Sequence, residues 1–177
     1  MKFSQVAIYA ALFLAGSEAA PVVEERGQTP KLQFVGFPSS AKCGGGAHQA
    51  AARVFSESHL EDTAESAARL NIKAPNLGVG SQTYPHTFQN RGNPPEIGNF
   101  KAQCTGDKQE YPLFTDKIFN GGDSSDRTRA ENPQADRIVI QIQPETKKGS
   151  NTYPVLFCGL MTHDGAPGND FVECSGW

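Results

Sequence analysis

The sequence predicts an α+β fold in which one amphipathic helix packs on a twisted antiparallel β-sheet and disulfide bonds crosslink the domain. Three observations predict it: one helical pattern early in the chain, several short strand patterns late in it, and four cysteines. The 18 glycines and 12 prolines, with few long apolar runs, also favour a small, loop-rich fold over a helical bundle.

The N-terminus has the pattern of an export signal. Lys2 supplies a positive end, Val6 to Ala15 is a short apolar run, and Ser17 and Ala19 are small residues at the cleavage positions. We therefore expect residues 1–19 to be a signal peptide and the protein to be secreted into the extracellular space. The apolar run is too short to cross a bilayer, so we expect no membrane partner.

The next segment, residues 20–42, carries charges and prolines without a strong period, which predicts a flexible arm or a propeptide. The folded domain is then expected to occupy residues 43–177. That length suits one domain. A monomer is expected, since two disulfides would already stabilise such a domain and no exposed apolar stripe is evident.

The clearest helical pattern lies in the segment "HLEDTAESAARL", from His59 to Leu70. Acidic residues stand early in it and Arg69 stands late, which suits the helix dipole. Apolar residues recur on neighbouring turns and give the helix one buried face. These residues are Leu60, Ala64, Ala67 and Ala68.

The second half of the chain predicts strands. In "DRIVIQI" the isoleucines alternate with other residues, so a strand here buries them and sends Arg137 to the opposite face, toward a cleft. The apolar run "PVLFCGLMTH" ends at His163, and "DFVEC" forms a short strand near the terminus. Residues 78–99, rich in Gly, Pro and Asn, are expected to be mostly loop around a short extended "TYPH".

The four cysteines predict two disulfides, because an exported protein folds in an oxidising compartment. The residues alone leave three pairings open. A zinc site is disfavoured, because no two cysteines form a C-x-x-C pair and the histidines are scattered, and we expect no metal and no cofactor. The cysteines are Cys43, Cys104, Cys158 and Cys174.

The formal net charge of -3 gives the protein no general electrostatic attraction to nucleic acid. It argues against a protein that binds long duplexes through many phosphate contacts. It is compatible with an enzyme that holds one or two nucleotides.

Several polar residues on the expected strands could carry chemistry. In "YPH", alternation puts Tyr84 and His86 on one face, although this tripeptide alone favours two partly buried structural residues. Glu110 and Arg137 each open a strand, but a lone Glu or Arg is most often a solvated surface residue. His163 ends a strand and precedes a Gly-rich turn whose backbone amides, with Asn169 and Phe171, could contact a base.

The segments "GSQTYPH", "EYP", "ADRIVI" and "GLMTHDGAPGNDFVEC" stand in the order and roughly the spacing found in the guanyl-specific fungal ribonucleases. The chain resembles that family from about Cys43 to Cys174. The resemblance implies the microbial ribonuclease fold and an RNA-cleaving domain at residues 43–177. It assigns the catalytic roles to Tyr84, His86, Glu110, Arg137 and His163, and base contacts to Phe88, Gln89, Asn90, Asn169 and Phe171.

A second resemblance is to the ribotoxins, which cut one loop of ribosomal RNA. The segments "YPHTFQN", "ENPQADR" and "LFCGLMTH" are similar to theirs, and the cysteine positions imply the pairs Cys104–Cys158 and Cys43–Cys174. Ribotoxins carry a long, lysine-rich loop before the Glu strand. Here, residues 91–109 are short and hold only three basic residues, so ribosomal RNA is an alternative substrate to single-stranded RNA in general.

Metal-free RNA cleavage needs a base for the 2'-hydroxyl proton, an acid for the departing 5'-oxygen, and donors or positive charge for the phosphorane. We interpret Glu110 as the base with His86 beside it, and His163 as the acid, while Arg137 and Tyr84 hold the phosphate. The product would be a 2',3'-cyclic phosphate. The favoured hypothesis is a general extracellular ribonuclease, the alternatives being a ribotoxin-like or host-directed toxin and a non-catalytic, RNA-binding effector.

Overall fold

The computed structural model describes residues 28–73, 78–80, 83–89, 100–122 and 130–177. Within these residues the chain forms one helix, α1, at Glu57–Lys73. The strands, in chain order, are β1 Lys31–Val35, β2 Ser40–Cys43, β3 Arg53–Ser56, β4 His86–Thr87, β5 Gln109–Pro112, β6 Asp136–Ile142, β7 Thr152–Thr162 and β8 Val172–Glu173.

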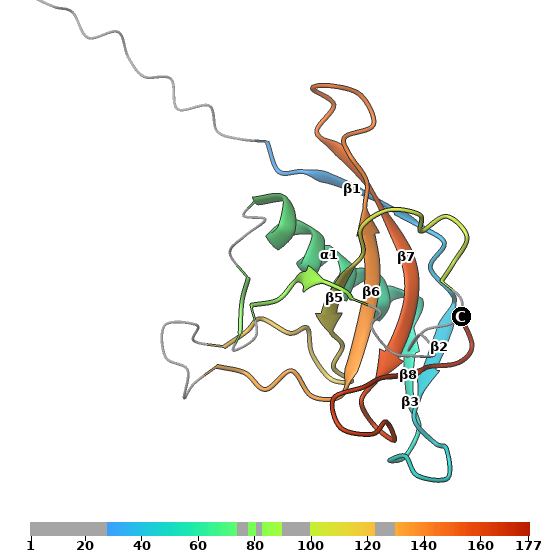
Figure 1. Cartoon of the computed structure of the whole chain (residues 1–177). Helices are drawn as coiled ribbons and strands as arrows, with labels where there is room; N and C mark the ends of the chain where they lie inside the picture. Colours follow the sequence, from blue (N-terminus) through green and yellow to red (C-terminus); the bar gives the residue numbers. More distant parts are fainter. Residues whose placement is uncertain (1–27, 74–77, 81–82, 90–99, 123–129) are drawn as a thin grey trace, which may run out of the picture.

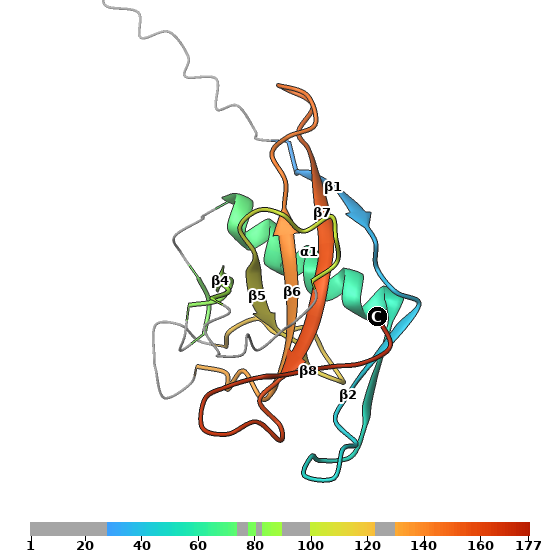
Figure 2. The ribbon, with the colours of Figure 1, turned by 45° about the vertical axis from the view of Figure 1, so that its right-hand side comes forward.

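The main sheet has the order β1-β7-β6-β5-β4, and β8 pairs with β7 near its end. All neighbours are antiparallel except β1, which runs parallel to β7. Strands β2 and β3 form a separate two-stranded hairpin. Figures 1 and 2 show α1 crossing one face of β5, β6 and β7, which leaves the opposite face of these strands without a helix. The expected fold class, one helix on a largely antiparallel sheet, is therefore confirmed.

Helix α1 begins where the sequence supplies a cap and packs through small side chains. The Oγ of Ser56 accepts a hydrogen bond from the backbone N–H of His59 at 3.3 Å, which satisfies one donor of the first turn. The buried positions, spaced three and four apart, form one face. Most of them are alanines, so the helix axis can approach the sheet closely. The buried residues are Leu60, Thr63, Ala64, Ala67 and Ala68.

Strand β7 contributes neighbouring residues to the apolar clusters on both faces of the sheet, because its pairing with β6 is irregular at one point. The register shifts between Val139 and Ile140, so β7 carries one extra residue at this point. As a result Phe157 and Leu160, three residues apart, both belong to the core on the helix side. Cys158, between them, belongs to a second apolar cluster on the other side.

Each apolar cluster contains one disulfide. Cys43–Cys174 lies in the cluster that α1 covers, and Cys104–Cys158 lies in the second cluster with Phe88, Val139, Leu156 and Met161. This is the pairing that the resemblance to the ribotoxins implies.

The segment before Cys43 differs from expectation, because residues 31–42 form strands β1 and β2 and not a flexible arm. Leu32 and Phe34 pack against the helix-side core, while the backbone of β1 extends the sheet at the edge of β7. The alternation of Leu32 and Phe34 is short, and the charges and prolines of residues 20–42 made it hard to recognise in the sequence. Residues 1–27, which include the expected signal peptide, lie outside the described part. In the described part, no helix is both long and apolar enough to span a bilayer.

Candidate active site

The helix-free face of the sheet carries Glu110 and His86 side by side. Strands β4 and β5 pair His86 with Glu110 in register, so the two side chains leave the sheet on the same face. His86 Nε2 lies 3.1 Å from Glu110 Oε1. Glu110 is only 6% exposed, whereas a third of the His86 side chain is open to solvent. A nearly buried carboxylate therefore lies in contact with a more exposed imidazole.

Arg137 lies on the same face but deeper. On β5 and β6, Glu110 pairs with Val139, which stands two residues from Arg137 and on the same side of the strand. The Arg137 Nε donates a hydrogen bond to the Tyr84 hydroxyl at 3.1 Å, and its Nη1 donates to the carbonyl oxygens of Pro133, Gln134 and Asp136. The prediction that Arg137 lies on the face opposite the isoleucines is confirmed. The prediction that its side chain faces a cleft is wrong, because Arg137 is only 2% exposed.

Tyr84 joins this buried arginine to the imidazole. Its ring stacks on His86 with 4.6 Å between centroids, and the guanidinium of Arg137 lies 5.3 Å from the centre of the same ring. Tyr84 itself is 1% exposed. The expected proximity of Tyr84 and His86 is thus present in the fold, with Tyr84 behind the histidine.

His163 follows the end of β7 and is oriented by the turn after it. Its Nδ1 lies 2.7 Å from the carbonyl oxygen of Asp170, so Nδ1 carries a hydrogen that it donates there. The ring stacks on Phe171 at 3.7 Å between centroids. Its backbone N–H donates to the carbonyl of Ala135, which precedes β6. These contacts leave Nε2 as the nitrogen that can exchange a proton with a ligand.

A cleft of about 660 Å³ opens beside these residues. Aromatic, amide and acid–base groups share its wall, which suits a ligand that has both a flat ring and hydrogen-bonding edges. His163 adjoins the cleft through its contacts with Asp170 and Phe171. The lining residues are His86, Thr87, Phe88, Gln89, Glu110, Asn169, Asp170 and Phe171.

Both histidines of the site have a lowered pKa. Burial is the largest cause in each case, and the positive charge of Arg137 lowers the pKa of both further, against a backbone hydrogen bond that raises it. For His86 this backbone partner is the Thr87 carbonyl, 3.4 Å from Nδ1, while Nε2 faces Glu110. Burial also raises the pKa of Tyr84, which keeps its hydroxyl protonated.

The fold brings nine of the ten predicted site residues around this cleft or directly beneath it. Asn90, predicted to contact a base, lies outside the described residues. Two contributors were missed, Thr87 and Asp170, both of which line the cleft. Asp170 orients His163 through a main-chain carbonyl, and such a role leaves no signal in residue type. In the part of the chain that is described, no group of three His, Cys, Asp or Glu residues could hold a metal ion.

Fold and site together define a small α+β protein, crosslinked by two disulfides, with an acid–base cleft on the helix-free face of its sheet. A family model described as ribonuclease matches residues 43–175, well over half of the chain. The chain therefore belongs to the ribonuclease family, as the sequence motifs led us to expect.

Several curated relatives are similar to the chain. They include guanyl-specific ribonuclease U1 of Ustilago sphaerogena, 38% identical over 96 residues that cover 54% of this chain and 70% of that protein. Guanyl-specific ribonuclease C2 of Aspergillus clavatus is 30% identical over 124 residues, covering 70% and 73%. Guanyl-specific ribonuclease F1 of Fusarium fujikuroi is 35% identical over 98 residues, and the matched part spans 55% of either chain.

Among solved structures, the Aspergillus ribotoxin restrictocin is similar with a TM-score of 0.49 and 21% identity. The match covers 77% of this chain and 99% of that one.

Proposed function

We propose that the protein is a secreted, metal-independent endoribonuclease that cuts single-stranded RNA 3' of guanosine and leaves a 2',3'-cyclic phosphate. The observation that carries the proposal is a pair of proton-transfer groups beside one cleft. Glu110 lines the cleft in contact with His86, and His163 is held against its wall by Asp170 and Phe171 with Nε2 left to react. Membership of the ribonuclease family supports RNA as the substrate. Such a pair can cyclise RNA because the nucleophile, the 2'-hydroxyl, belongs to the substrate.

Glu110 acts as the base in this proposal. The residue is 6% exposed and lines the cleft, so its carboxylate can meet a bound 2'-hydroxyl with little competing water. His86 donates from Nε2 to Glu110 and holds the carboxylate toward the cleft.

His163 acts as the acid in its protonated form, which carries a hydrogen on each ring nitrogen; it gives the proton on Nε2 to the departing 5'-oxygen and keeps the one on Nδ1. The hydrogen bond from Nδ1 to the Asp170 carbonyl fixes the ring so that Nε2 stays available. Stacking on Phe171 limits rotation of the ring. A fixed acid lowers the entropic part of the barrier, because the proton is already placed where the leaving oxygen will be.

Arg137 stabilises the phosphorane through its field. Its charge lowers the pKa of both His86 and His163, so its field reaches the groups on each side of the reacting phosphate. The same field that disfavours an imidazolium favours the extra negative charge of a phosphorane. Tyr84 holds the guanidinium through its hydroxyl at 3.1 Å.

Base choice is assigned to the aromatic and amide residues of the cleft. Phe88 and Phe171 meet edge to face at 6.3 Å between centroids, and Phe171 also stacks on the acid. Gln89 and Asn169 are exposed on the cleft wall and each offers an amide donor and acceptor. Guanine presents both donors and an acceptor on its edge, so paired amides match it. The printed names of the relatives include guanyl specificity, which supports this assignment.

Secretion completes the proposal: residues 1–19 are removed on export and the domain works outside the cell. One relative, from Gibberella baccata, is named an extracellular guanyl-specific ribonuclease. Two disulfides also suit an oxidising compartment.

The test is product analysis on a single-stranded RNA that contains all four bases, with and without a chelator. Wild type should cut 3' of guanosine to a cyclic phosphate at equal rates in both conditions. His163→Ala should lose about 100- to 10,000-fold of the rate, the usual value of one general acid. His48→Ala is the matched control, because His48 is exposed in the turn between β2 and β3 and should retain full activity.

Intact ribosomes serve as a parallel substrate. A single discrete ribosomal fragment with weak cutting of free RNA would replace the proposal with a ribotoxin-like enzyme. No cleavage of either substrate would reduce the protein to an RNA-binding module.

A further inference from the structure

Two carboxylates flank the residues to which the proposed function gives the phosphate and the acid. Asp136 directly precedes Arg137 on β6, and Asp164 directly follows His163 after β7. The strand register pairs Asp136 with Thr162, one residue before His163. Asp136 is only 3% exposed, so its charge needs a partner. Neither carboxylate lines the 660 Å³ cleft.

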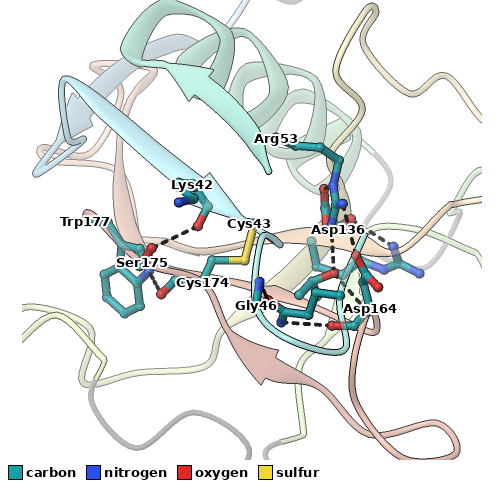
Figure 3. Close-up of a disulfide and its surroundings, with 12 residues drawn as sticks. Lys42, Cys43, Gly46, Arg53, Asp136, Asp164, Cys174, Ser175 and Trp177 are labelled. Atoms are coloured by element: carbon teal, nitrogen blue, oxygen red, sulfur yellow. Dashed lines mark hydrogen bonds and ion pairs between the residues drawn. A yellow bond between two sulfur atoms is a disulfide. The ribbon is translucent and has the colours of Figure 1, made fainter. Parts of the chain in front are cut away.

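A single side chain binds both carboxylates. Arg53, the first residue of β3, places Nε 2.6 Å from Asp136 Oδ2 and Nη2 2.8 Å from Asp136 Oδ1, which is a bidentate pair. Its Nη1 donates to Asp164 Oδ2 at 3.1 Å. Figure 3 shows Arg53 reaching from the hairpin toward Asp136, with Asp164 on the same side of the arginine.

The turn after His163 is also attached to the loop that joins β2 to β3. The backbone N–H of Ala50 donates to Asp164 Oδ2 at 2.8 Å, and Gln49 Nε2 donates to the Asp164 carbonyl at 3.1 Å. Within the turn, the Asp164 N–H donates to Thr162 Oγ1. The Cys43–Cys174 disulfide, drawn in Figure 3, attaches the end of β2, where this loop begins, to the segment after β8. The hairpin that carries Arg53 is therefore fixed to the site by both covalent and polar contacts.

We propose that Arg53 is a positioning residue for the proposed reaction, which sets the separation of Arg137 and His163 by binding the carboxylates next to them. The inference rests on the proposed function. The hydrogen bonds of Arg53 to β6, to β7 and to the turn after β7 go to neither of the two residues but to their neighbours, so Arg53 acts through the backbone of β6 and of that turn. Its guanidinium suits this role, because its fork binds Asp136 in one fixed geometry while the third nitrogen reaches Asp164.

The expected consequence is a defect in turnover. A displacement of about 1 Å between an acid and the phosphate can cost about 100-fold in rate, whereas binding of the base in the cleft does not involve Arg53. Arg53→Met should lower kcat for a guanosine-containing dinucleotide about 10- to 100-fold and change KM less than about 2-fold. A purely structural role would leave kcat of the folded fraction unchanged.

The experiment compares four variants with wild type, each assayed below its own unfolding transition as followed by circular dichroism. Arg53→Lys keeps one charge but not the fork, and should recover part of kcat. Asp164→Asn keeps the Arg53–Asp136 pair, so its kcat should lie between those of wild type and Arg53→Met. If Arg53→Met does not fold, Asp164→Asn and Arg53→Lys provide the test. Arg69→Met is the control, because Arg69 pairs with Glu65 on α1, away from the cleft.

Three results are decisive. A lowered kcat at constant KM in Arg53→Met and Asp164→Asn, with Arg69→Met unaffected, supports the inference. Full kcat in folded Arg53 and Asp164 variants would overturn it while the proposed function stands. A wild type that cuts no RNA would overturn both, because there is then no reaction for Arg53 to support.

Discussion

The two faces of the central sheet differ in what they bury. On β6, Ile138 and Ile140 point toward α1 and enter an apolar core, while Arg137 and Val139 point the other way. The helix-free face also buries Glu110 of β5. Strand β6 thus supplies isoleucines to the core on one side, and on the other side a buried arginine beside the second apolar cluster.

This difference separates stability from chemistry. Burial of apolar side chains stabilises the fold in proportion to area, whereas buried charges cost desolvation unless they are paired. The charged groups here have polar partners: Glu110 contacts His86, and Arg137 donates a hydrogen bond to the Tyr84 hydroxyl. We therefore expect substitutions on the helix-free face to change activity more than stability, and substitutions on the helix side to do the reverse.

The largest effect is expected from Glu110→Gln, which removes the proposed base and keeps the shape of the side chain. Activity should fall about 100- to 10,000-fold, because the amide cannot accept the 2'-hydroxyl proton. The free energy of unfolding should change by only about 1 kcal/mol, since the amide can still accept from His86. RNA cleavage assays and urea unfolding measure the two quantities. Glu173→Gln, at an exposed site, is the control; wild-type activity in Glu110→Gln would exclude Glu110 as the base.

The reciprocal test is Ile138→Ala on the helix side. Ile138 is fully buried in the core that α1 covers, so the smaller side chain leaves a cavity and should lower the free energy of unfolding by about 2–5 kcal/mol. The kcat of the folded protein should stay within about 2-fold of wild type. Val54→Ala, at a position 68% exposed, should cost no more than about 0.5 kcal/mol. A large loss of kcat in Ile138→Ala would show that the two faces are not independent.

Two tyrosines of the helix-side core sharpen the comparison because their hydroxyls have different partners. The Tyr84 hydroxyl accepts from Arg137, whereas the Tyr111 hydroxyl contacts Ser66 and Phe119. Tyr84→Phe removes the acceptor of the Arg137 Nε, and activity should fall about 10-fold. Tyr111→Phe removes a hydroxyl that donates to the Phe119 carbonyl at 2.7 Å, and should cost about 1 kcal/mol of stability with activity unchanged. Steady-state kinetics and thermal unfolding on both variants separate a hydroxyl that supports Arg137 from one that supports the fold. Equal loss of kcat in the two variants would contradict this difference.

The smallest effect is expected from pH. The pKa values of His86 and His163 are lowered by burial, so the folded state binds protons less readily than the unfolded state. This contribution to stability is complete above the ordinary histidine pKa of about 6.5 and is lost as the pH falls through the lower, folded values. Urea unfolding between pH 8 and pH 5 should show a smaller loss for His163→Gln than for wild type. Identical losses would mean that His163 is not buried as the structure indicates.

The sequence motifs predicted most of the site residues, but they did not predict the helix ends or the short strands β1, β2 and β3. Strand alternation was enough to place Ile138 and Arg137 on opposite faces, because the period of two is fixed by backbone geometry. The helix was predicted from His59 to Leu70 and extends by two or three residues at each end. Caps and terminal turns set such ends, and hydrophobic pattern alone does not define them.

The remainder depended on tertiary contacts. Strands β1, β2 and β3 are four or five residues long, too short to show a period, and they exist because they pair with β7 or with each other. The burial of Arg137 could not be predicted either, because three of its acceptors are backbone carbonyls, which every residue possesses. The partnership of Arg53 with Asp136 joins residues 83 positions apart, and a single sequence gives no sign of it.

The Cys43–Cys174 bond, which spans 131 positions, determines how the molecule responds to proteolysis. A protease that cuts once anywhere between residues 44 and 173 produces two fragments that stay joined through this bond. A cut between residues 105 and 157 leaves them joined by both disulfides. A nicked sample therefore migrates as one species on a non-reducing gel and separates only after reduction.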